Sequence, residues 1–352
     1  MNNRRGESRA RPRAGLAVGF LAIAAVAVAA EAARAEVYEL PPAGGDVIGA
    51  LIYVESRAAD TLLDIARRHG LGYEEIVRAN PGIDPWLPGA GTRVVLPTRY
   101  ILPPGPRRGL VLNLPEYRMY YFPEPEPGEP ALVMTYPVSI GRMDWATPLG
   151  ETRVVSKVVN PAWYPPESVR AEHAADGRPL PRVVPPGPDN PLGTRAMRLG
   201  LPSYLIHGTN RPAGVGMRVT HGCIRMFPED IEFLFERVRV NTPVRILNEP
   251  VKLGWDGDRL LMEVHRTLDV APVPVEDEQA AIAIDALAEP ALVEPPMPSR
   301  LTALTRRFVD ATSGRSGELD WDSAERLLER ADGIPVAVGN AIKNAATSAA
   351  SE

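Results

Sequence analysis

Cysteine, histidine and aromatic residues are scarce in this chain. The 352 residues include one cysteine, five histidines and 6% aromatic residues. A single cysteine excludes a disulfide framework and a cysteine-rich zinc module. Basic residues are not in excess either, because 39 basic and 44 acidic side chains give a net charge of −5, so nucleic-acid binding is not expected. With 45% apolar and 24% charged residues the composition is that of a globular protein.

A long uncharged run occurs only at the N-terminus. Residues 14–30 carry no charge and follow a basic segment at 1–13, and the sequence Ala33-Arg34-Ala35 comes soon after. A basic region, an apolar stretch shorter than about 20 residues and an A-x-A site are typical of a secretory signal peptide. We therefore expect residues 1–35 to be a cleaved signal peptide, with an uncleaved N-terminal anchor as the alternative. Either way the rest of the chain is exported.

Cleavage would leave an acidic protein without a membrane span. It removes six basic and two acidic residues, so 33 basic and 42 acidic residues remain and the net charge is −9. No later segment has the length and hydropathy of a transmembrane helix. We expect the mature chain to be soluble in an extracytoplasmic compartment.

Residues 51–97 predict a small strand–helix–helix–strand module. The strands are expected at 51–55 and 92–96, and the helices at 60–69 and 73–79, with Gly70 and Asn80-Pro81-Gly82 as their C-terminal stops. This arrangement resembles a LysM module, a small domain that binds N-acetylglucosamine-containing glycans. Ala59 departs from the glycine that is usual in that family. The alternative is a small docking domain without affinity for sugars.

Frequent prolines separate the predicted strands of the next region, 107–250. The chain has 38 prolines, about twice the ordinary share of roughly 5%. They separate short apolar runs that predict strands at 109–114, 117–122, 131–140, 151–159, 203–207 and 243–247. One amphipathic helix is predicted at 228–239. The region is therefore expected to be a mainly β domain, a sandwich or barrel, with one helix packed on it.

The C-terminal third divides into three segments. Residues 251–269 are expected to extend the β domain. Residues 270–300 hold six prolines and six acidic residues and predict an extended acidic linker. Residues 301–346 are expected to form a short helical region, with helices at 301–312 and 322–332. No chemistry can be assigned to it from the sequence.

The single cysteine, Cys223, lies among residues that could activate it. His207 ends an apolar run, and His221 and Arg225 flank the cysteine just before the helix predicted to begin at Pro228. An imidazole, a cation or a helix N-terminus can each lower the pKa of a thiol and make it a nucleophile. Two alternatives remain, namely a buried structural cysteine and a zinc site formed by His207, His221 and Cys223.

These motifs together resemble the active-site signature of the L,D-transpeptidases of the YkuD (ErfK/YbiS/YcfS/YnhG) family. The signature begins with His207-Gly208-Thr209-Asn210 and ends with Thr220-His221-Gly222-Cys223-Ile224-Arg225, and twelve residues, Gly208 to Val219, separate His207 from Thr220. Similar segments include Thr147-Pro148-Leu149-Gly150 and Trp163-Tyr164-Pro165-Pro166. The resemblance covers about 107–265, and with the signal peptide and the LysM-like module it implies a periplasmic protein with a YkuD-type β-sandwich.

The resemblance also implies roles for individual residues. Cys223 is the nucleophile, His207 the general base, and the Gly208 carbonyl orients the imidazole. Backbone amides of His221, Gly222 and Cys223 form an oxyanion hole, Arg225 binds a substrate carboxylate, and Thr209, Asn210 and Thr220 are further substrate-binding candidates. No metal or cofactor is expected.

The expected partners are peptidoglycan stem peptides and glycan strands. By the same resemblance Cys223 attacks the diaminopimelate carbonyl of a tetrapeptide stem, releases D-alanine and forms a thioester. The acyl acceptor is another stem, giving a 3→3 cross-link, or an anchored envelope protein. A peptidase that hydrolyses the same bond and a non-catalytic peptidoglycan-binding protein remain as alternatives.

Overall fold

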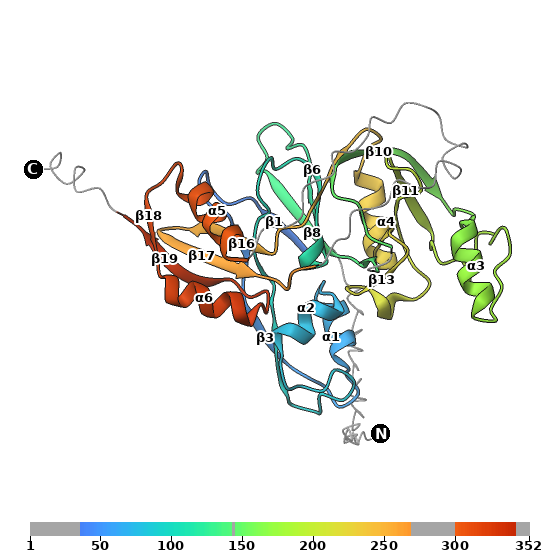
Figure 1. Cartoon of the computed structure of the whole chain (residues 1–352), viewed down its shortest axis with the longest axis horizontal. Helices are drawn as coiled ribbons and strands as arrows, with labels where there is room; N and C mark the ends of the chain where they lie inside the picture. Colours follow the sequence, from blue (N-terminus) through green and yellow to red (C-terminus); the bar gives the residue numbers. More distant parts are fainter. Residues whose placement is uncertain (1–35, 143–144, 269–299, 343–352) are drawn as a thin grey trace, which may run out of the picture. The chain divides into compact units, whose positions relative to one another are not determined.

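The computed structural model describes residues 36–142, 145–268 and 300–342 (Figure 1). The predicted signal peptide at 1–35 and nearly all of the predicted linker at 270–300 lie outside these ranges. Within them no helix combines the length and the apolar character that crossing a membrane would require.

The N-terminal module, residues 47–101, contains the predicted strand–helix–helix–strand order. β3 pairs with β4 in antiparallel register, and a second pair, β2 with β5, lies at the module's two ends. Thr61 caps α1, since its hydroxyl accepts from the Asp64 amide at 3.1 Å while the Asp64 carboxylate accepts from the Thr61 amide at 3.0 Å. The predicted elements are confirmed with slightly shorter ends. The bounds are β2 (Val47–Gly49), β3 (Ile52–Glu55), α1 (Leu62–Arg68), α2 (Tyr73–Ala79), β4 (Arg93–Leu96) and β5 (Arg99–Ile101).

A nine-stranded sheet forms the centre of the described structure. Its order is β1-β8-β7-β6-β15-β10-β11-β12-β14, and a separate parallel pair joins β9 to β13. The bounds are β1 (Glu36–Glu39), β6 (Gly109–Asn113), β7 (Arg118–Phe122), β8 (Leu132–Pro137), β9 (Ile140–Gly141), β10 (Gly150–Val159), β11 (Arg195–Leu199), β12 (Leu205–His207), β13 (Arg218–Thr220), β14 (Ile224–Arg225) and β15 (Pro243–Leu247). Two short 3-10 turns are η1 (Leu114–Glu116) and η2 (Pro212–Gly214).

Strand β10 links two parts of this sheet. Its first residues pair with β15, its last residues pair with β11, and the register shifts between Val154 and Ser156. A bulge of this kind lets one strand serve two sheet segments, as at the corners of sandwiches. One core cluster includes side chains from both segments and from α4 (Pro228–Arg237), among them Leu112, Ile206 and Leu234. The mainly β architecture is confirmed.

Two details of the central region differ from expectation. A second helix, α3 (Glu167–Ala175), lies between β10 and β11, where only loops and strands were predicted. Its residues are good helix formers, but they stand between proline clusters that favour loops. The predicted strand at 131–140 is divided, because β8 ends at Pro137 and the Val138 amide donates to the Tyr117 carbonyl at 2.7 Å.

The C-terminal unit combines segments that were predicted to be separate. β16 (Val251–Asp256) and β17 (Arg259–Val264) join β19 (Val336–Ala341) and β18 (Gly317–Leu319) in one four-stranded sheet. Helices α5 (Arg300–Thr312) and α6 (Trp321–Arg330) pack on this sheet (Figure 1). Residues 251–269 are therefore not an extension of the central sheet, and the C-terminal region is not purely helical. The two added strands are short and contain glycine, which conceals them in the sequence.

Candidate active site

The two halves of the sequence signature meet on neighbouring strands. β12 and β14 are parallel, with His207 opposite Arg225 and Ile206 opposite Ile224. The Met226 amide donates to the His207 carbonyl at 2.9 Å, which extends the pairing. Cys223 immediately precedes β14, so the pairing of β12 with β14 places Cys223 and His207 in neighbouring segments of the chain.

His207 is held as a neutral ring with a defined orientation. Its side chain is buried, and Nδ1 lies 2.7 Å from the Gly208 carbonyl oxygen. A carbonyl only accepts, so Nδ1 carries the proton and Nε2 keeps a free lone pair. Burial, and next the charge of Arg225, lower the pKa of His207 to about 3. The contact expected between the imidazole and Gly208 is present.

Cys223 is a partly buried, protonated thiol. Its Sγ donates to the Ser203 carbonyl at 3.6 Å, and within the described ranges no hydrogen bond joins it to His207. Burial raises the pKa of the Cys223 thiol to about 11, outweighing the Leu205 backbone and the charge of Arg225, which favour the thiolate. The expectation of a lowered thiol pKa is therefore wrong for the resting protein, because desolvation of a thiolate costs more than these contacts supply.

The Cys223 loop, residues 220–223, is fixed by side chains that bond to its carbonyl groups. Thr147 Oγ1 donates to the Gly222 carbonyl at 2.8 Å, and Thr220 Oγ1 donates to the Cys223 carbonyl at 2.6 Å. In the described part of the chain the backbone amides of residues 221–223 donate no hydrogen bond. Three adjacent free amides beside a thiol are suited to stabilise an oxyanion.

Glycine is required at position 222 for two reasons. Its φ is +95°, and a Cβ there would lie 2.7 Å from Cε1 of Tyr204. The Tyr204 ring therefore supports the Cys223 loop from one side, and its hydroxyl donates to the Ala146 carbonyl at 3.3 Å. No sequence motif singles out Tyr204.

The remaining predicted substrate contacts differ in their exposure. Thr220 and Thr209 are buried, and Thr209 Oγ1 accepts from the Arg211 amide at 2.9 Å. Both hydroxyls thus bond to backbone groups, which leaves little of either side chain for a substrate. Asn210 is exposed.

Arg225 offers a cation without an anionic partner. Burial, and next the charge of Arg211, lower its pKa, and its Nε is buried without a hydrogen bond. Among the described residues its guanidinium makes no ion pair. A partly buried, unpaired guanidinium beside a thiol is suited to bind a carboxylate.

The His221 side chain contacts Glu172 and Trp145. Its Nε2 lies 3.0 Å from Glu172 Oε2, and its ring packs edge-on against Trp145 with centroids 5.2 Å apart. Glu172 lies on α3, the helix that the sequence did not predict, so its role could not be foreseen. His207, His221 and Cys223 do not form a group of converging metal ligands among the described residues, which does not support the zinc alternative.

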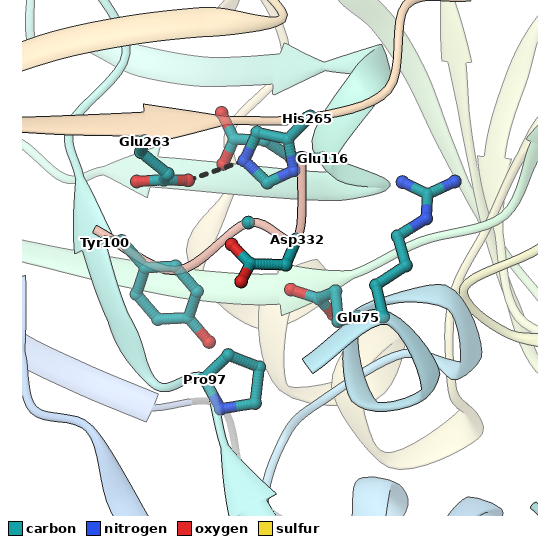
Figure 2. Close-up of a pocket in the computed structure, with 9 residues that line it drawn as sticks. Glu75, Pro97, Tyr100, Glu116, Glu263, His265 and Asp332 are labelled. Atoms are coloured by element: carbon teal, nitrogen blue, oxygen red, sulfur yellow. Dashed lines mark hydrogen bonds and ion pairs between the residues drawn. The ribbon is translucent and has the colours of Figure 1, made fainter. Parts of the chain in front are cut away.

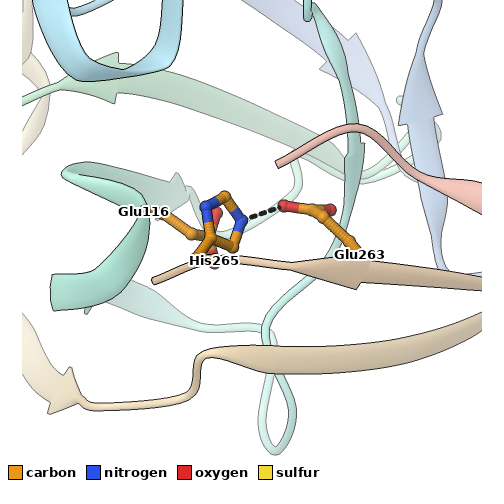
Figure 3. A group of neighbouring side chains, drawn as sticks. All are labelled: Glu116, Glu263 and His265. Carbon is orange, nitrogen blue, oxygen red and sulfur yellow. Dashed lines mark hydrogen bonds and ion pairs between the residues drawn. The ribbon is translucent and has the colours of Figure 1, made fainter. Parts of the chain in front are cut away.

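A second cluster of ionisable groups lies where the N-terminal module, the central sheet and the C-terminal unit meet. Figure 2 shows a small pocket there, lined by residues that include Glu75, Tyr100 and Asp332. Glu116, Glu263 and His265, which also line this pocket, converge there (Figure 3). Their geometry is that of possible metal ligands.

The carboxylates of this cluster already have partners. Lys252 Nζ lies 2.8 Å from Glu116 and 2.9 Å from Glu263, whose second oxygen accepts from the Ile101 amide at 2.6 Å. Tyr120 donates to Glu116 at 2.5 Å. Lys252 therefore occupies the place of a cation, and the cluster is best described as a buried ion network that joins the three parts.

Comparisons with known proteins identify the family of the chain. A family model of the L,D-transpeptidase catalytic domain (YkuD) matches residues 107–246. The chain is 36% identical over 326 residues to the protein named probable L,D-transpeptidase YcfS of Escherichia coli (strain K12), covering 91% of this chain and 93% of that protein. It is 39% identical over 265 residues to probable L,D-transpeptidase YbiS of the same strain, covering 74% and 85%.

A solved structure is also similar in part. The crystal structure of L,D-transpeptidase 3 from Mycobacterium tuberculosis aligns with a TM-score of 0.29 and 21% identity, over 44% of this chain and 67% of that one. The family assignment depends on the sequence relatives, which extend over most of both chains. This chain belongs to the YkuD family of L,D-transpeptidases.

Proposed function

We propose that this protein is a periplasmic peptidoglycan L,D-transpeptidase that uses Cys223 as its nucleophile. The observation that carries the proposal is the arrangement around the thiol. The strands β12 and β14 and the loop between β13 and β14 hold Cys223 beside three kinds of group. These are the oriented, neutral imidazole of His207, the three free amides of residues 221–223 and the unpaired guanidinium of Arg225. Family membership supplies the substrate class, a tetrapeptide stem of peptidoglycan.

The resting charges determine how the first step proceeds. Thiol and imidazole are both neutral, so His207 Nε2 accepts the thiol proton as Sγ attacks the diaminopimelate carbonyl. The oxyanion that forms is stabilised by the amides of residues 221–223, each worth about 3 kcal/mol in comparable sites. His207 then returns the proton to the departing D-alanine amine, and the thioester remains.

Arg225 and the N-terminal module position the substrate in this proposal. Arg225 pairs with a carboxylate of the stem peptide, because it has no anionic partner of its own among the described residues. The LysM-like module, residues 51–97, binds the glycan strand. An amine of a second stem, or of an envelope protein, accepts the acyl group in the second step.

The proposal is tested by intact-protein mass spectrometry of residues 36–352 incubated with disaccharide-tetrapeptide. We expect a mass increase equal to the disaccharide-tripeptide acyl group in the wild type and none in Cys223→Ala or His207→Ala. His69→Gln, at the end of α1, is the matched histidine control and should acylate normally. Full acylation of the Cys223→Ala protein would refute the nucleophile.

Adding an amine acceptor separates the remaining functions. A transpeptidase forms a cross-linked product, whereas a peptidase releases only D-alanine and free tripeptide. A binding protein gives neither product.

A further inference from the structure

The segment between β10 and β11 carries helix α3 beyond the edge of the sheet (Figure 1). The segment closes on itself, since Trp163 and Val184 exchange backbone hydrogen bonds at 2.9 Å and Asn190 Nδ2 donates to the Pro161 carbonyl at 2.8 Å. These bonds hold the two arms of the segment together. The helix is thereby presented as a fixed element.

One residue of α3, Glu172, reaches the Cys223 loop. Its Oε2 lies 3.0 Å from His221 Nε2, and its two oxygens accept from the Arg142 guanidinium at 2.9 and 3.2 Å. Arg142 is itself attached to the loop, because its backbone amide donates to the Thr220 carbonyl at 2.9 Å. Glu172 therefore connects to both residues that precede Gly222.

The carboxylate is ionised under all ordinary conditions. Hydrogen bonds from Arg142, and next from His221, lower the pKa of Glu172 to about 2. The His221 ring also packs edge-on against Trp145. The ring is therefore held by Trp145 and, through Nε2, by Glu172. Residue 221 cannot rotate without breaking one of these contacts.

This restraint bears on the amides beside the thiol. The backbone of residue 221 supplies the first of the three free amides, and the next two follow directly in the chain. An oxyanion hole works only when its donors are held at the position where charge develops. A misplacement of about 1 Å can cost roughly a hundredfold in rate.

We propose that Glu172 is a positioning residue for thioester formation: it holds His221, and with it the amides of residues 221–223, in the geometry that receives the oxyanion. Glu172 touches neither the thiol nor His207. Among the residues of the Cys223 loop, its printed side-chain contact is with His221, and the proposal assigns its effect to that contact. The inference rests on the proposed function of Cys223.

The test compares Glu172→Gln with Glu167→Gln in the full mature chain. Glu167 is on the same helix and pairs with Arg170, away from the loop, so it controls for the loss of one carboxylate from α3. We expect Glu172→Gln to lower kcat for acylation by the tetrapeptide about 10- to 100-fold, with KM changed less than about threefold. Glu167→Gln should behave like the wild type.

A second readout separates positioning of the amides from damage to the thiol. Alkylation of Cys223 by iodoacetamide needs no oxyanion hole, so its rate should be unchanged in Glu172→Gln. A parallel loss of alkylation, or an acylation rate equal to that of Glu167→Gln, would overturn the inference. An inactive wild type would instead refute the proposed function, and the inference with it.

The pathway through His221 is tested in the double variant. In a His221→Ala background, Glu172→Gln should cause no further loss of acylation. An additive loss would show that Glu172 acts elsewhere and would contradict the assignment.

Discussion

Alkylation of Cys223 by iodoacetamide should follow the ionisation of a buried thiol rather than that of a thiolate–imidazolium pair. Burial raises the pKa of Cys223 from its ordinary value of 9.0 to about 11. At neutral pH this lowers the thiolate fraction about a hundredfold, a difference of about 3 kcal/mol. Burial also keeps His207 neutral, with a pKa of about 3. At pH values between these two pKa values, both the thiol and the imidazole are therefore mainly uncharged.

The assay measures the second-order rate constant of alkylation at 25 °C from pH 6 to pH 10. Because only the thiolate reacts, the logarithm of the rate should rise with a slope of about one across the whole range. N-acetylcysteine, a solvated thiol, serves as the reference and should level off near its own pKa. Circular dichroism at each pH confirms that the protein stays folded.

A plateau between pH 6 and pH 8 would refute this reasoning. Such a plateau means that the thiolate is already formed, as in a Cys–His ion pair, and the deprotonation would then precede attack on the substrate. A rate independent of pH would also show that the Arg225 charge outweighs burial.

Two predictions concern the attachment of the N-terminal module. Gly216→Ala should destabilise the protein more than Gly82→Ala. Both glycines have a positive φ. A Cβ at position 216 would lie 2.3 Å from the Tyr73 amide nitrogen, whereas a Cβ at position 82 would meet nothing within 4 Å. We expect about 1 kcal/mol for Gly82→Ala and at least twice that for Gly216→Ala in urea denaturation, and equal losses would contradict the contact. Arg118→Met should lower the free energy of unfolding by about 3–5 kcal/mol, because it leaves the Glu75 carboxylate buried and unpaired. The double variant, with Glu75→Leu added, should recover most of this stability. If it does not, the ion pair is not the cause of the loss.

The sequence predicted well those elements whose information is local. The helix α2 at Tyr73–Ala79 and the strand β15 at Pro243–Leu247 have the predicted bounds. Their apolar periodicity and their flanking stop residues lie within a few residues of each other. The cysteine motif was also recognisable, because its members are close in the chain.

Contacts between distant segments were not predictable in this way. Strand β19 pairs with β17, although more than 70 residues separate them in the sequence. Neither the length nor the composition of β19 indicates this partner. Glu172 lies 49 residues before His221, and nothing in either segment specifies the other. Pairing of this kind depends on the packing of the whole chain.

The sequence alone identified the residues that we propose to carry the chemistry: one cysteine, its neighbouring histidines and arginine, and the glycine that the loop requires. Only the tertiary structure decided their charge states and their supports. Burial made the thiol and the imidazole neutral, which no local pattern reveals, because the pKa of a group depends on how much water the rest of the fold leaves around it.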